Sequence, residues 1–592
     1  MQQLKISITF IPLIIATLMS SPAVSETLLN NQMLGQTSQY LAMHAKDPVH
    51  WQEWNQKTIQ LAQKTNKPLF ISSGYYACHW CHVMQEENYQ NTTTADIINQ
   101  HFIAVKIDRE LNPELDTALV DFSKRATGQG GWPQHAILTP NGNPFAAFIY
   151  LPNPDLNVYL QRVALLWKDK SEQVIELAEQ SNTPPQTQAS MTNQSLLNAA
   201  EFRIALLDAL SQKKDDFSGG LKTTAKFPRA PLLNNLLTLD TNETTEEWLI
   251  TTLDLMQSEH LQDHIHGGFY RYTVDPEWQI PHFEKMTYNS ALLAQTYLLA
   301  ANKFQREDYL LTAINTLRYL KKHLFNNSIG LYQSSQSAID ENGVEGGDYI
   351  FSKKQLQKTL TAEEYQLVER EWQLSSPPTY EHGWHPKPIQ HPLWSSIKRK
   401  LTIPTATIPK DHKSVISWNG LMLSSLSHAA VIAEKSAQPE YRSQAEELAS
   451  TLVKILMSNN PPRAVGLNGE LLGQANLEDF AFTLQGLYDY QNLTQNKQFK
   501  NTIKKLEDKI LKQFFTDSGW QFESSPLINT ISNLDFTKDG PLPSSLAIVS
   551  CLTPKNKQNQ LSALINPDQL IENSIEYSSY LARTGSLNCN GD

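Results

Sequence analysis

The sequence has few cysteines, with four in 592 residues. This excludes the class of small proteins that are held together by several disulfides. Positive charge is also scarce, because 49 lysines and arginines stand against 60 aspartates and glutamates, a net charge of −11. That balance offers no basic surface for nucleic acid, so we expect no nucleic-acid partner. No run of 18 apolar residues occurs after the first 25 residues, so we expect no membrane span in the mature chain.

The first 25 residues have the pattern of a targeting segment. Lys5 gives a short positive start, residues 6–19 are mostly apolar, and Ala23-Val24-Ser25 is a small-x-small cleavage site before Glu26. The apolar part is short for a bilayer span. We therefore expect a cleaved signal peptide over residues 1–25 and a periplasmic or secreted protein, with a retained signal anchor as the alternative.

Cys78-His79-Trp80-Cys81 is the most informative segment, because it follows a strand-like run at residues 67–72 and begins a helical pattern. A thiol at a helix start lies beside unpaired N–H groups and the positive end of the helix dipole, and both stabilise a thiolate. Two intervening residues also allow the two sulfurs to form a disulfide. The segment predicts redox chemistry, with Cys78 as the exposed attacking thiolate and Cys81 as the resolving thiol.

Other interpretations of this segment remain open. Cys78 to His82 matches C-x-x-C-H, the attachment motif of c-type haem, and it contains sulfur and nitrogen metal ligands. Neighbouring helical positions point in different directions, so the four donors do not converge on one ion without distortion. The leading interpretation is a redox pair with no cofactor and no metal; haem attachment, a metal site and a structural pair are the alternatives. Cys551 lies in an apolar run and is predicted to be a small buried residue.

The pattern around the cysteines favours redox chemistry, because its elements follow the order of a thioredoxin fold. Asn141-Gly142 between two apolar runs indicates a hairpin. Pro133 precedes the first hairpin strand, where thioredoxin-like proteins carry a cis-proline facing the dithiol. We therefore predict a cis Trp132–Pro133 bond and a substrate-binding surface of Trp80, Trp132 and Pro133. The expected helices are residues 51–66, 78–90, 93–101, 113–126 and 155–180, and the expected strands are 67–72, 102–107, 135–139 and 145–150.

The chain divides into several parts by composition. Residues 181–195 are rich in Asn, Thr, Pro, Gln and Ser and are typical of a linker. We predict a signal peptide at 1–25, a thioredoxin-like α/β domain at 26–180, a linker at 181–195 and a helical domain at 196–592.

The helical domain shows recurrent helical periodicity, with loops dense in Gly, Pro, Trp and His. No fixed repeat period occurs, which argues against an open solenoid. Long loops at 263–281, 330–352 and 375–413 favour a closed α/α toroid with its loops gathered over one end. The clearest helical stretches are 248–256, 291–299, 310–320, 416–434, 441–457, 476–493, 501–515 and 573–582.

One loop of this domain is rich in residues that suit a polar, sugar-like pocket. Imidazole, carboxylate and indole groups occur together within 21 positions, although such residues also cap helices and fill gaps. A structural role is therefore the alternative for each of them. The group comprises His264, His266, Asp275, Trp278, His282 and Glu284, of which Asp275, Trp278, His282 and Glu284 form the candidate pocket.

These segments together resemble a known family over nearly the whole mature chain. Residues 31–152 look like the DUF255 thioredoxin-like domain, which occurs in the spermatogenesis-associated thioredoxin-like proteins and their bacterial relatives. The resemblance implies a second region similar to the six-hairpin α/α toroids of glycosidases and sugar 2-epimerases. The motifs that carry it are residues 38–41, 44–49, 78–84, 105–110 and 127–133, followed by 226–228, 267–272, 281–286, 418–422 and 477–481.

Several positions depart from the family pattern. Asn289 stands where relatives carry an acid, and residues 337–339 replace an Asp-Ala-Asp element. Residues 543–546 also differ from a Pro-Ser-Gly-Asn type sequence. Ser72 lies six residues before Cys78, where thioredoxins place a buried acid. The losses after Met286 weaken a carbohydrate-active interpretation, and the loss at Ser72 requires another group to assist thiol exchange.

The leading functional hypothesis is a thiol–disulfide oxidoreductase that acts on a protein or small-molecule thiol or disulfide. A carbohydrate-active enzyme, either a glycoside hydrolase or a sugar epimerase, is the second hypothesis, and it would use His282 and Glu284 with a carbohydrate in the toroid. A non-catalytic platform that binds a client or a glycan is the third. The retained pair of cysteines beside the lost toroid acids favours the first.

Overall fold

The computed structural model describes residues 29–182, 199–402, 408–523, 527, 536–554, 557 and 567–580. The predicted signal peptide, residues 1–25, lies outside the described residues. The predicted linker, residues 181–195, also lies outside them apart from Ser181 and Asn182, which end a helix. Residues 31–592 form one compact unit, separate from residues 1–30.

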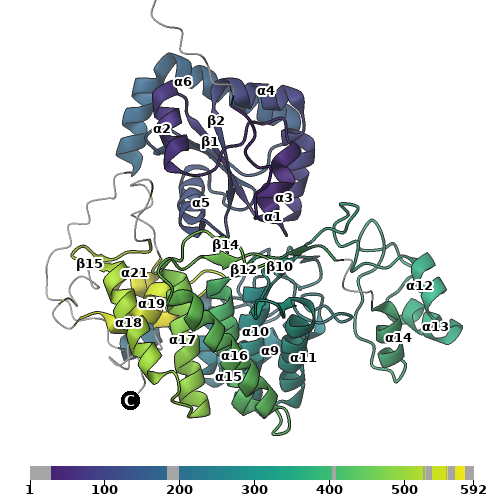
Figure 1. Ribbon diagram of the computed structural model, residues 1–592. Helices are drawn as coiled ribbons and strands as arrows, with labels where there is room; N and C mark the ends of the chain where they lie inside the picture. The colour runs from purple at the N-terminus through teal and green to yellow at the C-terminus, as the bar shows by residue number, and fades with distance from the viewer. Residues whose placement is uncertain are drawn as a thin grey trace, which may run out of the picture. The chain divides into compact units, whose positions relative to one another are not determined.

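Residues 29–182 are built on a four-stranded sheet with strand order β2-β1-β3-β4 (Figure 1). The central strand β1 pairs in parallel with β2 and antiparallel with β3, and β3 pairs antiparallel with β4. This is the thioredoxin-like sheet that the sequence predicts. The strands are β1 (Leu69–Gly74), β2 (Ile103–Asp108), β3 (Gln134–Leu138) and β4 (Pro144–Phe148).

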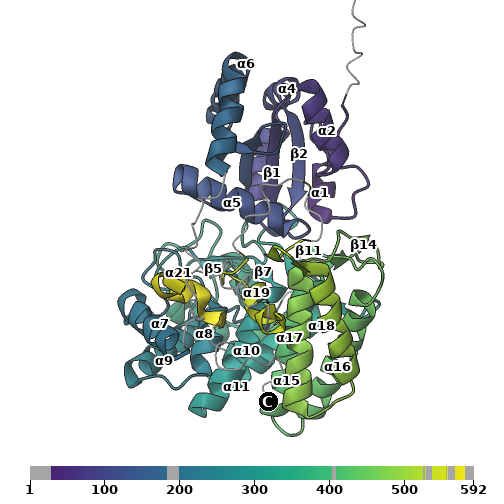
Figure 2. The ribbon, with the colours of Figure 1, turned by 90° about the vertical axis from the view of Figure 1, so that its left-hand side faces the viewer.

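Helices lie on both sides of this sheet (Figure 2). Apolar residues such as Phe70, Ala104 and Ile137 alternate along the strands, so their side chains share one face, and they form a core with residues of η2, α4 and α6. The predicted helix at 78–90 consists of the α-helix α3 and a π-helical turn, η2. The elements are α1 (Gln39–Met43), η1 (His44–Lys46), α2 (Gln56–Thr65), α3 (His79–Met84), η2 (Gln85–Tyr89), α4 (Thr92–His101), α5 (Pro113–Thr127) and α6 (Asn153–Asn182).

The second part of the chain is mostly helical, and its inner helices close into a ring. Each inner element packs on the next, in the order α8, α10, α15, α17, α19, η6 and back to α8. Helices α10 and α15 have apolar residues on almost all sides, and they are therefore buried almost all round. The ring confirms the predicted α/α toroid. Its members are α8 (Ala230–Leu237), α10 (Thr287–Phe304), α15 (Ile416–Ile432), α17 (Leu477–Thr494), α19 (Ser545–Val549) and η6 (Ser574–Tyr580).

A second set of helices covers the ring. Helix α11 packs on α10, α16 on α15 and α17, α18 on α17, and α7 on η6 and α21. The Tyr297 hydroxyl of α10 donates to the Leu253 carbonyl of α9 at 2.8 Å. These helices are α7 (Ala199–Lys213), α9 (Glu243–Ser258), α11 (Glu307–His323), α16 (Gln438–Leu456), α18 (Lys500–Phe514) and α21 (Pro567–Glu572).

Between α11 and α15 the sequence predicts long loops, and there the structure is more regular than expected. Three short helices pack on one another around a small apolar core of their own, which includes Leu356, Val368 and Ile397. Helix α14 lies inside the predicted loop 375–413. The sequence does not predict this helix, because the apolar residues of its eight-residue stretch are too few to show a clear period. The helices are α12 (Lys353–Thr359), α13 (Ala362–Glu371) and α14 (Trp394–Leu401). Elsewhere in the chain, a 3-10 turn, η4 (Ser550–Leu552), follows α19.

Loops at one end of the ring form small sheets of two-residue strands. Two of these sheets have three strands, in the orders β11-β10-β7 and β12-β13-β14. The strands are β5 (Tyr272–Thr273), β6 (Pro281–His282), β7 (Lys285–Met286), β8 (Phe325–Asn326), β9 (Leu331–Tyr332), β10 (Ser335–Gln336), β11 (Lys410–Asp411), β12 (Ser414–Val415), β13 (Ala464–Val465), β14 (Leu471–Leu472), β15 (Phe515–Thr516) and β16 (Gly519–Trp520).

Buried charges from these loops contact the thioredoxin-like sheet. The Lys413 ammonium lies 3.0 Å from the Asp108 carboxylate and 2.8 Å from the Glu110 carboxylate, and it also pairs with Asp411. The Arg463 guanidinium donates to the Glu110 carbonyl at 3.1 Å. Charges that are removed from water are stable only when they are paired and hydrogen-bonded, so this contact fixes both partners closely.

Candidate active site

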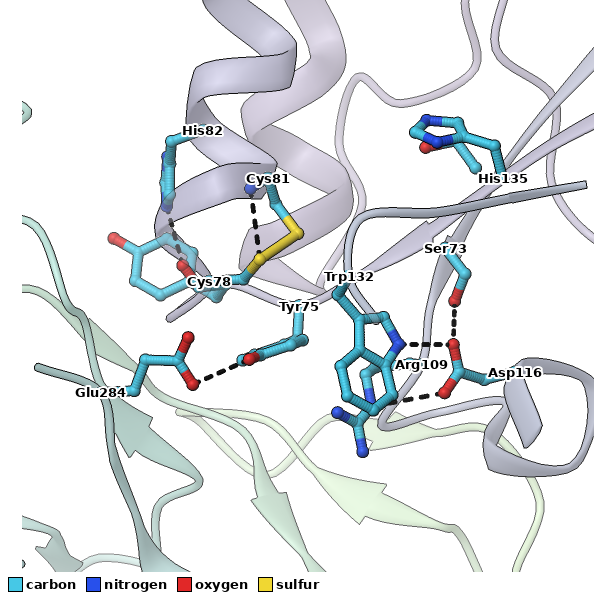
Figure 3. The surroundings of a disulfide bond; sticks show 12 residues. Ser73, Tyr75, Cys78, Cys81, His82, Arg109, Asp116, Trp132, His135 and Glu284 are labelled. Atoms are coloured by element: carbon cyan, nitrogen blue, oxygen red, sulfur yellow. Dashed lines mark hydrogen bonds and ion pairs between the residues drawn. A yellow bond between two sulfur atoms is a disulfide. The ribbon is translucent and has the colours of Figure 1, made fainter. Parts of the chain in front are cut away.

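Cys78 and Cys81 form a disulfide at the start of α3 (Figure 3). Cys78 is the N-cap residue, with extended backbone, and its sulfur accepts the N–H of Cys81 at 3.2 Å. Strand β1 ends four residues earlier, so the sheet and the helix together place the pair. The prediction that these two sulfurs pair at a helix start is confirmed.

The pair is buried, which corrects the prediction that Cys78 faces solvent. Cys78 is 3% exposed and Cys81 is 1% exposed. Both belong to a core that continues into the helical region, and the Ala338 N–H donates to the Ala77 carbonyl at 3.2 Å. A loop of the helical region thus covers the dithiol, which local sequence around the cysteines does not reveal.

The peptide bond between Trp132 and Pro133 is cis, as predicted. The Trp132 indole N–H donates to the Asp116 carboxylate at 2.8 Å, and the Arg109 guanidinium lies 3.8 Å from the centre of a Trp132 ring (Figure 3). Pro133 is buried. Of the predicted substrate-binding residues, Trp80 is the most accessible: it is 42% exposed and packs against Tyr150 at 4.9 Å between ring centres.

Tyr75 links the dithiol loop to Glu284 of the helical region. Its hydroxyl donates to the Glu284 carboxylate at 2.8 Å (Figure 3). The same hydroxyl accepts from the Arg271 guanidinium. Arg271 also pairs with Glu284 at 3.2 Å. All three residues are buried, and the burial of the Tyr75 hydroxyl raises its pKa well above its usual range. The Glu284 carboxylate is therefore held by a cation and by a hydroxyl of the other region.

A shared carboxylate, Glu345, connects His79 of α3 with His282. It lies 3.1 Å from the His79 imidazole and 3.5 Å from the His282 imidazole. Burial and, second, the negative charge of Glu284 raise the pKa of Glu345 to about 7. Burial, followed by the proximity of His282, lowers the pKa of His79 to about 4. Between about pH 4 and pH 7 the proton of this pair thus lies on the Glu345 carboxyl rather than on the His79 imidazole.

Sequence reasoning missed Glu345, because it lies in a Gly-rich loop with no motif of its own. It also could not separate the four candidate pocket residues. His282 stacks on Tyr272 and contacts Glu345, and Glu284 is in the adjoining network. The other two have structural partners outside this network. The Asp275 carboxylate accepts backbone N–H groups of residues 277, 279 and 280, and the buried Trp278 indole donates to the Ser218 carbonyl at 2.7 Å.

Ser72 stands at the position where thioredoxins have a buried acid, and in this structure it contacts a buried amine, that of Lys106. The Lys106 ammonium donates to the Ser72 hydroxyl at 3.0 Å and lies over the rings of Tyr40, Trp51 and Tyr89. Burial lowers the pKa of Lys106 to about 7. The surroundings of the dithiol therefore contain a cation held by aromatic faces.

The donor groups of the haem and metal alternatives have other partners in the structure. The disulfide uses both thiols that haem attachment would require. The His82 imidazole makes a 2.8 Å hydrogen bond with the Tyr76 carbonyl. Searching the described part of the chain reveals no group of three or more His, Cys, Asp or Glu placed to hold a metal ion.

Two further observations concern the rest of the chain. Cys551 is predicted to be buried with its pairing left open, and the structure shows it half-buried and disulfide-bonded. Its apolar sequence context does not report a sulfur partner. Cys589 lies outside the described residues.

Among the helices that the structure describes, none combines the length and apolar character needed to cross a membrane.

Comparison with known proteins agrees with the thioredoxin-like sheet. Residues 30–184 match the family described as "Protein of unknown function, DUF255". Mouse spermatogenesis-associated protein 20 is 29% identical over 564 residues, which cover 84% of this chain and 71% of that protein. The uncharacterized protein B0495.5 of Caenorhabditis elegans is 28% identical over 594 residues, covering 88% of this chain and 79% of its own.

The solved structures that match this chain share little sequence with it. A D-mannose isomerase is 11% identical with a TM-score of 0.39, covering 65% of this chain and 85% of its own. An α-amylase from Clostridium perfringens is 11% identical with a TM-score of 0.37, covering 67% of this chain and 98% of its own. Residues 30–184 thus match the DUF255 family, and the chain is similar to spermatogenesis-associated protein 20.

Proposed function

We propose that this protein is a thiol–disulfide oxidoreductase that acts outside the cytoplasm. The observation that carries the proposal is the Cys78–Cys81 disulfide at the start of α3, with the Cys78 sulfur accepting a backbone N–H. That environment stabilises a thiolate at Cys78, the form that attacks and leaves in exchange reactions. The signal-like first 25 residues support an exported protein, in which such a pair forms readily.

In the proposed reaction a substrate thiolate attacks the Cys78 sulfur. A substrate–Cys78 disulfide forms, the Cys78–Cys81 bond breaks, and its electron pair leaves on the Cys81 sulfur. A second substrate thiolate then releases the first substrate as a disulfide and leaves Cys78 as a thiolate. Two substrate thiols are oxidised and the protein disulfide is reduced to a dithiol; the reverse sequence reduces a substrate disulfide.

The burial of the pair restricts the substrate. Trp80 is exposed and adjoins the cysteines in sequence, whereas the loop that bears Ala338 is hydrogen-bonded to Ala77, next to Cys78. A folded protein surface is too broad to reach such a pair, so we propose that a small thiol or an extended peptide segment approaches from the Trp80 side.

A carbohydrate-active helical region is the second candidate, and one observation favours it. Glu345, with a pKa raised to about 7, lies near enough to Glu284 to be affected by its charge. A protonated and an ionised carboxyl group together are the chemistry of glycoside hydrolysis. However, the Tyr75 hydroxyl and the Arg271 guanidinium already bind the Glu284 carboxylate. We rank this function below redox exchange.

The two functions are separated by an activity test on matched variants. We expect the purified protein to catalyse reduction of a peptide disulfide by a small thiol, and Cys78→Ser to abolish this activity. Glu284→Gln should retain most of it, and no common glycoside should be hydrolysed. Glycoside turnover that Glu284→Gln abolishes and Cys78→Ser leaves intact would reverse the ranking.

A trapping experiment identifies the substrate class. The Cys81→Ser variant lacks the resolving thiol, so mixed disulfides on Cys78 should accumulate in the native compartment. Cys78→Ser is the matched control and should trap nothing at this site. If Cys81→Ser captures no thiol-containing molecule, the assignment of Cys78 as nucleophile is wrong.

A further inference from the structure

Tyr40 has a buried hydroxyl with no hydrogen-bond partner among the described residues. The side chain is fully buried, on helix α1 in the thioredoxin-like region. Leaving a hydroxyl unpaired in the interior costs free energy, and natural proteins rarely do so without a reason. An unpaired donor at a redox site suggests a partner that exists in only one redox state.

The Tyr40 hydroxyl oxygen and the Cys81 sulfur lie within about 5 Å of each other, because both are close to the position that a Cβ atom on Gly74 would take. A Cβ atom placed on Gly74 would collide with the Tyr40 hydroxyl oxygen and lie 2.7 Å from the Cys81 sulfur. The hydroxyl and the sulfur are therefore neighbours across Gly74, and the last residue of β1 must be glycine to leave room for both. No local motif around Cys78 would reveal this approach.

Tyr40 is held in place by contacts that do not involve its hydroxyl. The hydroxyl of Ser38, the N-cap of α1, donates to the Asp108 carboxylate at 2.6 Å. The Tyr40 ring packs edge-on against His44 at 5.3 Å between ring centres, and the Lys106 ammonium lies 5.1 Å from its centre. Removing the hydroxyl oxygen alone should therefore leave the ring and the helix where they are.

We propose that Tyr40 donates a hydrogen bond to the Cys81 thiolate that forms when the disulfide opens. This inference rests on the proposed redox function. In the closed disulfide the Cys81 sulfur is a weak acceptor, and the Tyr40 hydroxyl makes no hydrogen bond. When a substrate thiolate attacks Cys78, the electron pair of the broken bond stays on the Cys81 sulfur, and the Tyr40 O–H stabilises that charge without giving up its proton.

The chemistry of the surroundings agrees with a donor that remains protonated. Burial, followed by the nearby Tyr89 and three carboxylates, raises the pKa of Tyr40 well above its usual range. The titratable groups that face Tyr40 are His44, Asp47, Tyr89, Lys106, Asp108 and Asp116.

The pKa of the Cys81 thiol tests the proposal without any substrate. It is measured in the Cys78→Ser variant from the pH dependence of thiolate absorbance, with Cys78→Ser/Cys81→Ser as the blank. A hydrogen bond to a charged group is strong enough that Tyr40→Phe should raise the Cys81 pKa by about one unit, or tenfold less thiolate at a given pH. Tyr89→Phe is the matched control, because its hydroxyl bonds to Ser72 and His135 instead, and it should shift the pKa much less.

A second variant guards against loss of folding. Fluorotyrosine at position 40 keeps the side-chain shape and is a stronger donor, so it should lower the Cys81 pKa. A Cys81 pKa that neither Tyr40→Phe nor fluorotyrosine moves would overturn the assignment of Tyr40. Failure of the wild-type pair to cycle between disulfide and dithiol in glutathione buffers would instead overturn the redox function, so the two failures are distinguishable.

Discussion

Two buried lysines show how differently the thioredoxin-like and helical regions treat charge. Lys106, behind the dithiol, lies among aromatic rings and a serine hydroxyl, and burial lowers its pKa to about 7. Lys413, in the helical region, pairs with three buried carboxylates, and their charges raise its pKa well above the usual range despite burial. One amine can lose its proton near neutral pH, whereas the other is a fixed structural charge. We therefore assign the proposed redox chemistry to the first region, and infer that the second region positions and covers the dithiol.

Removing the fixed charge should have the largest effect. Lys413→Met strands Asp108, Glu110 and Asp411 without a cation, and breaking a buried pair in this way costs about 3–5 kcal/mol. We expect a loss of that size in the free energy of unfolding measured by urea denaturation. Lys106→Met is the matched control: it strands no carboxylate and should cost far less. Equal losses in the two variants would contradict the distinction between the two lysines.

Gly74 tests how tightly the dithiol is packed. Gly74→Ala forces a methyl group against the Tyr40 hydroxyl and the Cys81 sulfur, and such overpacking costs about 1–3 kcal/mol. We expect that loss in unfolding free energy, together with slower closure of the Cys78–Cys81 disulfide after reduction. At Gly131 the nearest atom to an added Cβ is 3.8 Å away, so Gly131→Ala should change little. A neutral Gly74→Ala would show that the packing around the sulfur is loose.

Much of this arrangement was predictable from the sequence, because it depends on local signals. The strand–helix order, the Asn141-Gly142 hairpin and the position of Pro133 predict the sheet, and apolar periodicity predicts the long helices of the ring. Burial of Cys78 was not predictable, since the loop that covers it contains Ala338, 260 residues away in sequence. Glu345 and Tyr40 were missed for the same reason: their chemistry arises from contacts that only the folded chain brings together.

The Glu345 cluster gives a smaller, pH-dependent effect. Its pKa of about 7 lies above the usual 4.5, so between these values the folded protein holds a proton that the unfolded chain releases. Its contribution to stability is therefore complete below about pH 4.5 and is lost as the pH rises through 7. Since the side chain is about one-third exposed, the effect should be only about 1 kcal/mol.

The direction of this pH dependence is checked by measuring the free energy of unfolding of wild type and Glu345→Gln at pH 5 and pH 8. The free energy of unfolding of the variant minus that of wild type should be larger at pH 8 than at pH 5. The reason is that wild type loses the contribution of the Glu345 proton as the pH rises, whereas glutamine has no such proton to lose. Exposed Glu341 lies in the same loop, and Glu341→Gln provides the control. The opposite sign for Glu345→Gln would mean that the carboxylate is ionised when it contacts the two histidines.

The most direct test of the redox assignment is an equilibrium titration of Cys78–Cys81 in glutathione buffers, scored by mass spectrometry of the peptide that contains the pair. We predict one reversible two-electron transition with a midpoint above about −300 mV, the level below which structural disulfides lie. Tyr40→Phe should shift the equilibrium toward the disulfide. A pair that stays oxidised at every ratio until the protein unfolds would show that Cys78–Cys81 is a structural crosslink, and would contradict the account.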